Sequence, residues 1–201
     1  MNTKITILLF LALLSVSTSP IIGRALTGVG AISISFWRML IASIILWIFS
    51  SIKPQGRMKV ASNYNRTICA GILLGIHFAL FFEAIKITKI ANATFLGTLA
   101  PFFTLLIEYF ILKRVYSKKI ILGLFCTFLG SLIILSYQFD LESKYTIGNI
   151  YAVLCSISIA IALMIGEKVR SNEGTIVYTR NLYLSAAFTL LVIALFTNEQ
   201  L

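Results

Sequence analysis

One uninterrupted apolar stretch, residues 90–112, limits what this chain can fold into. It reads IANATFLGTLAPFFTLLIEYFIL, and its single charged residue is Glu108. A helix of about 20 residues is long enough to cross a hydrocarbon core of about 30 Å. A helix on the surface of a soluble protein carries a polar face, which this stretch lacks. The stretch is therefore predicted to span a membrane.

The rest of the chain has the same character. Of the 201 residues, 59% are hydrophobic and 12% are charged, whereas an average soluble domain has about 45–50% and about 25%. We therefore predict an all-α polytopic membrane protein with about seven transmembrane helices. The predicted spans are residues 5–22, 31–52, 67–87, 90–112, 120–137, 147–166 and 182–196.

The formal net charge of +10 resides in short basic clusters between the apolar stretches. Clusters of this kind are typical of membrane loops, so the bilayer is an expected partner and nucleic acid is not. The clusters at residues 53–66, 113–119 and 168–180 fall on one side of the predicted topology. The positive-inside rule then places the N-terminus in the cytoplasm, and the Ile- and Lys-rich composition indicates a bacterial inner membrane.

The first apolar stretch has a second interpretation. Lys4, the apolar run at residues 5–14 and the small residues that follow also fit a secretory signal peptide that is cleaved near residue 19. The apolar character resumes through Pro20, which favours a retained span. The orientation of the later helices is the same in both cases.

The chain contains a weak internal repeat. When its start is placed over its end, Ile5 aligns with Ile147. The same offset aligns Arg38 with Arg180. Five predicted spans separate the two starts, so the second copy enters the membrane from the opposite side, as in the inverted repeats of secondary transporters. We predict a first five-helix repeat over residues 5–137 and the start of an inverted second repeat over residues 147–201. The second repeat is incomplete, so a truncated sequence is expected.

Several motifs between residues 81 and 135 point to a family. They are the FEAIKIT segment at residues 82–88, the small residues around Asn92, Pro101 within the fourth span, and Gly123 and Gly130 in the fifth. With these features the chain resembles EamA-type members of the drug/metabolite transporter superfamily. The resemblance implies a ten-helix carrier, built from two inverted five-helix repeats, that moves a small organic metabolite or drug.

Two further positions bear on this resemblance. Arg38, near the start of the second span, matches the arginine that the family usually has there. The loop after the fourth span reads Lys113-Arg114, where the family often carries a Gly-Glu pair.

Glu83 and His77, both in the third span, are the ionisable candidates for a substrate cavity. A carboxylate inside a span is costly and usually faces a cavity or a partner. Glu83 is thus either a substrate or proton site or an acid paired with Lys86 or Lys89. His77 is the single histidine of the chain. It either couples protons by titrating near neutral pH or only satisfies a hydrogen bond in the core.

Three other residues complete the predicted cavity. Pro101, with Gly97 four residues earlier, marks a candidate break in the fourth span, which would expose backbone groups to a cavity. Asn92 begins the same span, where a glycan could not be attached, so its glycosylation sequon is a chance match. Arg38 either holds an anionic group or extends its charge to the head groups.

Small residues predict close helix packing on two spans. Gly71, Gly75 and Ala79 form a ridge on the third span, with the GxxxG spacing that lets helices approach closely. Gly123 and Gly130 share a face of the fifth span. If the ridge on the third span instead faces outward, the chain would act by association, for example as a homodimer, without transporting anything.

The sequence contains no motif of an enzyme, a nucleotide-binding loop or a metal site, and we expect no cofactor. Uphill transport would then depend on a coupling ion or an exchanged metabolite. The chain has three cysteines, an odd number. They lie at or within apolar stretches, where they are expected to act as small buried residues. Two alternatives remain open: an inactive remnant of a transporter, and an intramembrane enzyme in which Glu83, Glu108 and His77 converge.

Overall fold

The computed structural model describes residues 3–135 and 142–201, and these residues are almost entirely helical. The last two residues of the predicted span 120–137 lie outside the described residues. The described elements are α1 (Thr3–Ala25), α2 (Ala31–Ile52), α3 (Ala61–Ile87), α4 (Ile90–Gly97), α5 (Ala100–Phe110), α6 (Lys118–Leu135), the 3-10 turn η1 (Ser143–Tyr145), α7 (Thr146–Arg170) and α8 (Thr175–Thr197).

Six stretches of the described residues are long and apolar enough to cross a membrane. They are α1, α2, α3, α4 together with α5, α7 and α8. The remaining predicted span corresponds to α6, which has 18 residues and reads KKIILGLFCTFLGSLIIL. The prediction of an all-α polytopic membrane protein is confirmed, whereas the division into inverted repeats stays a prediction.

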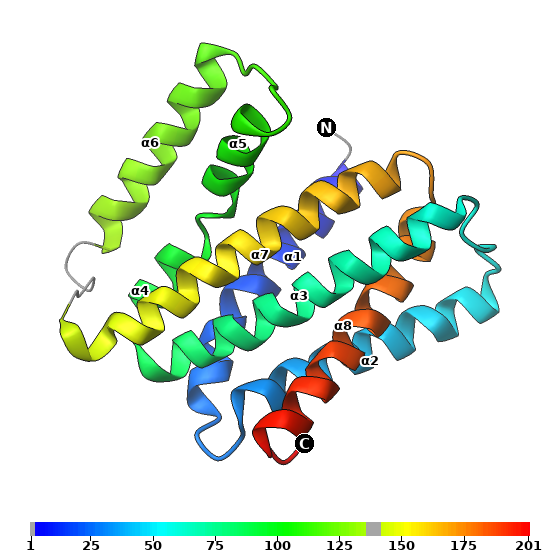
Figure 1. Cartoon of the computed structure of the whole chain (residues 1–201), viewed down its shortest axis with the longest axis horizontal. Coiled ribbons are helices and arrows are strands. Elements are labelled where there is room, and N and C mark those ends of the chain that lie inside the picture. Colours follow the sequence, from blue (N-terminus) through cyan, green and yellow to red (C-terminus); the bar gives the residue numbers. More distant parts are fainter. Residues whose placement is uncertain (1–2, 136–141) are drawn as a thin grey trace.

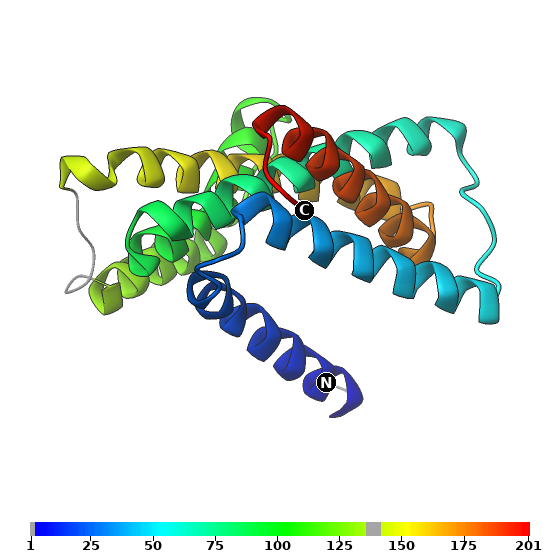
Figure 2. The ribbon, with the colours of Figure 1, turned by 90° about the horizontal axis from the view of Figure 1, so that it is seen from below.

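Helices α2, α3, α7 and α8 form the centre of the molecule (Figure 1). The most extensive contacts join α3 to α7, followed by those of α8 with α2 and with α3. Helix α1 leaves this group at an angle (Figure 2) and packs on α3 and α4. Helices α5 and α6 form a pair that projects from the same group (Figure 1). The core is therefore built by helices from both ends of the chain.

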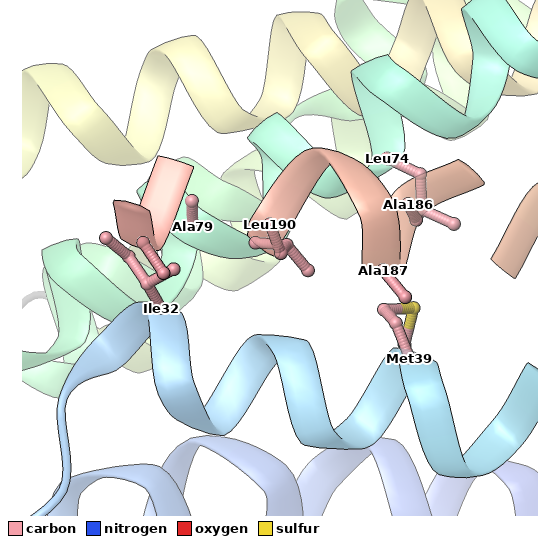
Figure 3. Close-up of a cluster of buried hydrophobic side chains, with 8 residues drawn as sticks. Ile32, Met39, Leu74, Ala79, Ala186, Ala187 and Leu190 are labelled. Atoms are coloured by element: carbon pink, nitrogen blue, oxygen red, sulfur yellow. The ribbon is translucent and has the colours of Figure 1, made fainter. Parts of the chain in front are cut away.

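The centre of this core is a cluster of aliphatic and small side chains from α2, α3 and α8 (Figure 3). Its fully buried members include Ala186 and Leu190 of α8, which contact Ile32, Met39, Leu74 and Ala79 across the interface. Small residues let the helix backbones come close, which is how membrane helices gain packing contacts without a hydrophobic driving force.

Successive spans, with α4 and α5 counted as one, run in alternating directions, which gives the bundle two ends (Figure 1). We call the end where α3 finishes the Glu83 side, and the end where α7 joins α8 the Glu173 side. The Arg24 guanidinium at the end of α1 donates to the Ile85 carbonyl on the Glu83 side. The loops that precede α3 and α6, with Lys59 and Lys118, both lie on the Glu173 side, as the predicted topology requires.

The predicted span 90–112 is broken, as its glycine and proline suggested. Helix α4 ends at Gly97 and α5 begins at Ala100. Pro101 stands in the first turn of α5, where a proline has no hydrogen bond to lose and its fixed φ suits a helix start. The break is therefore a restart of the helix and not a kink within it.

Two helices begin earlier than expected. Helix α3 starts at Ala61 instead of residue 67, and α8 starts at Thr175 instead of residue 182. Their first two turns contain polar residues, Asn63 and Arg180, which a hydropathy criterion excludes. Both residues are buried by contacts with distant segments, so tertiary structure extends these helices.

Candidate functional site

A cavity of about 340 Å³ lies between α2, α3, α7 and α8, and Glu83 lies in its wall. Four of its residues, Ile76, Ala79, Leu80 and Glu83, are spaced so that they share one face of α3. The opposite walls come from the other three helices, with Ile32, Tyr151, Ile193 and Thr197. The result is an apolar chamber whose single charged lining group is a carboxylate.

The lysines that could neutralise Glu83 have other contacts. The Lys86 ammonium donates to the Val29 carbonyl in the loop between α1 and α2. The Lys89 ammonium lies 5.7 Å from the centre of the Tyr145 ring. A second carboxylate, Glu199, is close enough to interact electrostatically with Glu83. Lys86 also interacts electrostatically with Glu83, so the alternative in which Glu83 pairs with a neighbouring lysine stays open.

Glu199 connects the C-terminal end of α8 to the start of α2. Its Oε1 accepts a hydrogen bond of 2.9 Å from the Ser33 backbone N–H. A carboxylate at this position satisfies an N-terminal amide of α2 and is stabilised by the positive end of the helix dipole. A Cβ added to Gly30 would lie 1.7 Å from Glu199 Oε1, so the carboxylate occupies the space that a side chain would fill.

His77 lies at the interface of α3 and α7, outside the lining of the Glu83 cavity. Its Nδ1 is 2.9 Å from the Cys155 carbonyl oxygen, and because that oxygen can only accept, Nδ1 donates. The imidazole also stacks on Phe81, with ring centroids 6.0 Å apart and planes 12° apart. This environment fits the alternative in which the histidine satisfies a core hydrogen bond.

Arg38 lies on the other side of α3, facing α1. Its guanidinium donates to Ser19 Oγ at 2.8 Å. It also lies over the rings of Phe78 and Phe82, at 5.0 and 5.2 Å from their centroids. A cation held between two aromatic faces is stabilised by cation–π attraction. Arg38 thus joins α1, α2 and α3.

Asn92 belongs to a buried polar junction of α3, α4 and α7. Asn149 Oδ1 accepts two hydrogen bonds of 2.9 Å, from Asn92 Nδ2 and from Thr88 Oγ1. All three residues are buried. The structure therefore places the five predicted cavity residues in five different surroundings, and of these five only Glu83 lines the cavity between α2, α3, α7 and α8.

Pro101, the fifth of them, follows the helix break, where α7 satisfies a backbone group. Ser156 Oγ donates to the Leu96 carbonyl at 2.6 Å. A Cβ added to Gly97 would meet Cys155 Sγ at 3.6 Å and the Phe81 ring at 3.1 Å. Helix α7 therefore approaches the broken segment closely and supplies the hydrogen bond that the break requires.

The predicted packing glycines differ from one another. A Cβ on Gly71 would lie 2.5 Å from Ser185 Cβ, and one on Gly75 would lie 3.0 Å from the Ala186 carbonyl oxygen, so α8 covers this ridge. Gly123 and Gly130 have nothing within 4 Å of an added Cβ. For these two residues of α6 the expected packing is not found among the described residues.

Glu108 lies at the opposite end of the bundle from Glu83. It is buried, and its carboxylate accepts from Arg114 at 2.6 Å. Arg114 is also 3.7 Å from Glu167, near the end of α7 on the Glu173 side. Glu108 thus pairs with the basic loop that follows α5, and Glu83, Glu108 and His77 do not converge on one site.

Comparison with known proteins adds to this geometry. The profile of the EamA-like transporter family matches residues 3–136. The chain belongs to the EamA-like transporter family. It is also 28% identical, over 172 residues, to the uncharacterized transporter YyaM of Bacillus subtilis (strain 168). That match covers 81% of this chain and 55% of YyaM, so the chain spans about half the length of its relative. No solved structure matches the chain.

Membership of the EamA-like family, together with the six apolar spans, makes this an integral membrane protein of the drug/metabolite transporter type. The proteins of this family are transporters and not enzymes. The expected identity of the chain is therefore confirmed at the level of family and fold.

Sequence reasoning on this EamA-like chain missed Glu173, in the loop between α7 and α8. Its carboxylate accepts from the backbone N–H groups of Lys59 and Val60 at 2.9 Å and from Asn63 Nδ2 at 3.0 Å. These hydrogen bonds, first the one from the Lys59 N–H, lower the pKa of Glu173 below its ordinary value. No local pattern indicated this contact, because the structure alone shows that α3 begins after Val60, whose side chain offers no acceptor for the first amides of the helix.

A second missed contact strengthens the Glu173 side. Arg180 lies over the Trp47 ring, 4.5 Å from its centroid, and donates to the Gly56 carbonyl at 2.7 Å. Together with Glu173, it holds the loop between α2 and α3 against the α7–α8 hairpin. Both contacts join residues more than a hundred positions apart, so no local pattern indicates them.

Proposed function

We propose that this EamA-like protein moves a small organic molecule by alternating access, with the Glu83 cavity as its substrate site. One observation carries the proposal. The cavity lies where α2 and α3, from the predicted first repeat, meet α7 and α8, from the predicted start of the second. Carriers built from inverted repeats bind their substrates between the two halves.

The lining of the cavity limits the chemistry of its substrate. Its volume of about 340 Å³ falls within the range of about 300–1,000 Å³ that is usual for small-molecule sites. Ile32, Ile76 and Leu80 offer contacts to an apolar body, while the Glu83 carboxylate favours an amine or another N–H donor. A carboxylate in a span can also accept a proton, so exchange of a proton for a cationic substrate fits the same group.

The Glu173 side is proposed to face the cytoplasm. The loops and helix ends on this side carry most of the lysine and arginine residues, including Lys53, Arg57, Lys113 and Lys168. Basic loops are retained in the cytoplasm during insertion. Helix α1 runs toward the Glu83 side, so the N-terminus is placed in the cytoplasm too, and the membrane is taken to be a bacterial inner membrane.

Two other functions are less well supported. Association through the glycine ridge of α3 would require that ridge to be accessible, but α8 covers it. An intramembrane enzyme would require Glu83 and Glu108 to meet, but they lie at opposite ends of the bundle. The experiment below distinguishes a working carrier from an inactive remnant of a transporter.

The test is uptake into proteoliposomes that contain the purified chain. The probes are labelled amino acids, nucleosides and sugars, and the fluorescent cation ethidium. We expect uptake of at least one amine-bearing probe, and we expect Glu83→Gln to lower it about tenfold or more by removing the charge that pairs with the amine.

The matched control is Glu142→Gln, which removes a carboxylate that pairs with Lys144 at 2.6 Å outside the cavity. This variant should transport as the original chain does. Equal uptake by the Glu83→Gln variant would remove Glu83 from the substrate site. Failure of the original chain to take up any probe would favour the remnant.

A further inference from the structure

A second and larger cavity, of about 530 Å³, lies between the broken α4–α5 helix and α6. Its walls are mainly aromatic and aliphatic, with Phe95, Leu99, Phe102, Leu124, Phe125 and Phe128. Figure 1 shows α5 and α6 as neighbouring antiparallel helices that stand away from the centre of the molecule. This cavity is separate from the Glu83 cavity and shares no residue with it.

The cavity exists because of the helix break. After Gly97 the chain changes direction and restarts at Ala100, so α5 does not continue the line of α4. Helix α6 contacts α4, and it lines the space with Leu124, Phe125 and Phe128. A straight helix facing a broken one leaves space between them, and the space lies next to the break.

The lining offers a ligand little polar contact. Its two hydroxyls are already bonded within their own helices: Thr98 Oγ1 donates to the Phe95 carbonyl at 3.0 Å, and Thr127 Oγ1 donates to the Gly123 carbonyl at 2.8 Å. The lining contains no ionisable side chain. The occupant of such a chamber is therefore a hydrocarbon, because a polar group placed there would lose its hydrogen bonds.

The cavity is open to the surroundings of the helices, and those surroundings are the bilayer. The lining residues Phe102, Ile121 and Phe125 are 43%, 49% and 56% exposed. They belong to helices whose outer faces are apolar, as lipid-facing surfaces are. The molecule that reaches this opening at the highest concentration is a membrane lipid, through its acyl chain.

We propose that this cavity binds one acyl chain of a membrane phospholipid, which inserts between α5 and α6 beside the helix break. Phe128 of α6 reaches the opposite wall, since its ring lies 5.5 Å from that of Phe95 and 6.4 Å from that of Phe102, centroid to centroid. The bound chain replaces the side-chain contacts that α6 lacks and so holds α6 against α5. The proposal does not depend on transport.

Native mass spectrometry of the detergent-solubilised full chain tests this site. The probe is dioleoyl phosphatidylglycerol, added in increasing amounts to delipidated protein. We expect one saturable lipid adduct on the original chain. Leu124→Trp fills the cavity from α6 and should weaken that adduct about tenfold or more. Leu122→Trp, the same substitution at a position on the same helix that does not line the cavity, should leave it unchanged.

Folding and other ligands are controlled in the same experiment. Circular dichroism and gel filtration check each variant, and Leu105→Phe, which fills the cavity from α5, replaces Leu124→Trp if that variant is not monodisperse. Diphenylhexatriene, an apolar dye without a head group, is the competing probe. The proposal is overturned if the cavity-filling variant and Leu122→Trp bind the lipid equally, or if the original chain binds the dye but no lipid.

Discussion

Glu83 is the residue on which the proposed mechanism depends. It lies one turn before the end of α3, in line with Ile76, Ala79 and Leu80 on the face that lines the cavity. A charged side chain inside a span costs a few kcal/mol on insertion scales, less toward a helix end. The nearby Lys86 donates to a backbone carbonyl and also interacts electrostatically with Glu83. A costly carboxylate in an apolar wall is the pattern expected of a binding residue.

Gly71 tests the packing of α3 against α8. An added Cβ would lie 2.5 Å from Ser185 Cβ and 2.8 Å from the Leu182 carbonyl oxygen. Since backbone cannot move aside as a flexible side chain can, Gly71→Ala is expected to cost about 1–3 kcal/mol in the free energy of unfolding. The measurement is thermal unfolding in detergent micelles, followed by circular dichroism.

Gly123→Ala is the matched control, because an added Cβ at this position of α6 meets nothing within 4 Å. Alanine is favoured over glycine in a helix by about 1 kcal/mol, so this variant should be as stable as the original chain or more stable. Equal melting temperatures for Gly71→Ala and Gly123→Ala would contradict the close approach of α8.

At the scale of elements, the broken helix is the feature that other helices must accommodate. The break leaves the Leu96 carbonyl to be satisfied by Ser156 of α7. Both cavities lie beside elements that this break positions: α5 and α6 on one side, and α7 on the other. Breaks of this kind are found where membrane helices line cavities, because backbone groups can be satisfied there by side chains or ligands.

Ser156→Ala removes the hydrogen bond that supports the break. The expected loss is about 1 kcal/mol in stability, the usual value for one intramolecular hydrogen bond. Amide hydrogen exchange should become faster at residues 97–100, where the helix restarts. Ser51→Ala, which removes an intrahelical bond to the Trp47 carbonyl at an exposed site, should leave that segment unchanged. Unchanged exchange in the Ser156→Ala variant would show that the break does not rely on α7.

Much at this scale could be predicted from the sequence. The apolar runs predicted the ends of the helices to within about two turns, and Gly97 with Pro101 predicted the position of the break. The early starts of α3 and α8 could not be predicted, because Asn63 and Arg180 are polar by composition and buried only by distant partners. The free-energy cost of a carboxylate at Glu83 could be recognised from the sequence. Its neighbours Glu199 and Tyr151 could not, because the packing of α7 and α8 brings them close.

Glu173 holds two elements together on its side of the bundle, and pH tests this. Its pKa is lowered from an ordinary value of 4.5 by hydrogen bonds that only the folded chain provides. Its contribution to stability is therefore complete above about pH 4.5 and is lost as the pH falls through the lower folded value. Thermal unfolding between pH 7 and pH 3 should show this loss in the original chain.

In the Glu173→Gln variant the melting temperature should be lower near pH 7, and its difference from the original chain should shrink as the pH falls. Glu167→Gln is the control, because the Glu167 side chain is 63% exposed and exposed ion pairs contribute about 0–1 kcal/mol. A constant difference between the Glu173→Gln variant and the original chain over this range would mean that the carboxylate charge is not what caps α3.

At the scale of the whole molecule, helices from the two ends of the chain enclose the Glu83 cavity. Contacts at both ends of the bundle join these helices in this conformation: Glu173 and Arg180 on one side, and Lys86 and Glu199 on the other. The sequence indicated an inverted repeat, but it could not indicate these contacts, because each contact joins segments that are far apart in the chain. Alternating access would break one set of contacts while the other holds.

The most direct test of alternating access needs no known substrate. Leu80, in the cavity wall, is replaced by cysteine in a chain whose native cysteines, Cys69, Cys126 and Cys155, are removed. A membrane-impermeant maleimide is then applied to either side of sealed vesicles, with Leu122→Cys as the lipid-facing control. The account predicts that Cys at position 80 is labelled from both sides and Cys at position 122 from neither. Labelling of position 80 from one side only, or from neither, would contradict it.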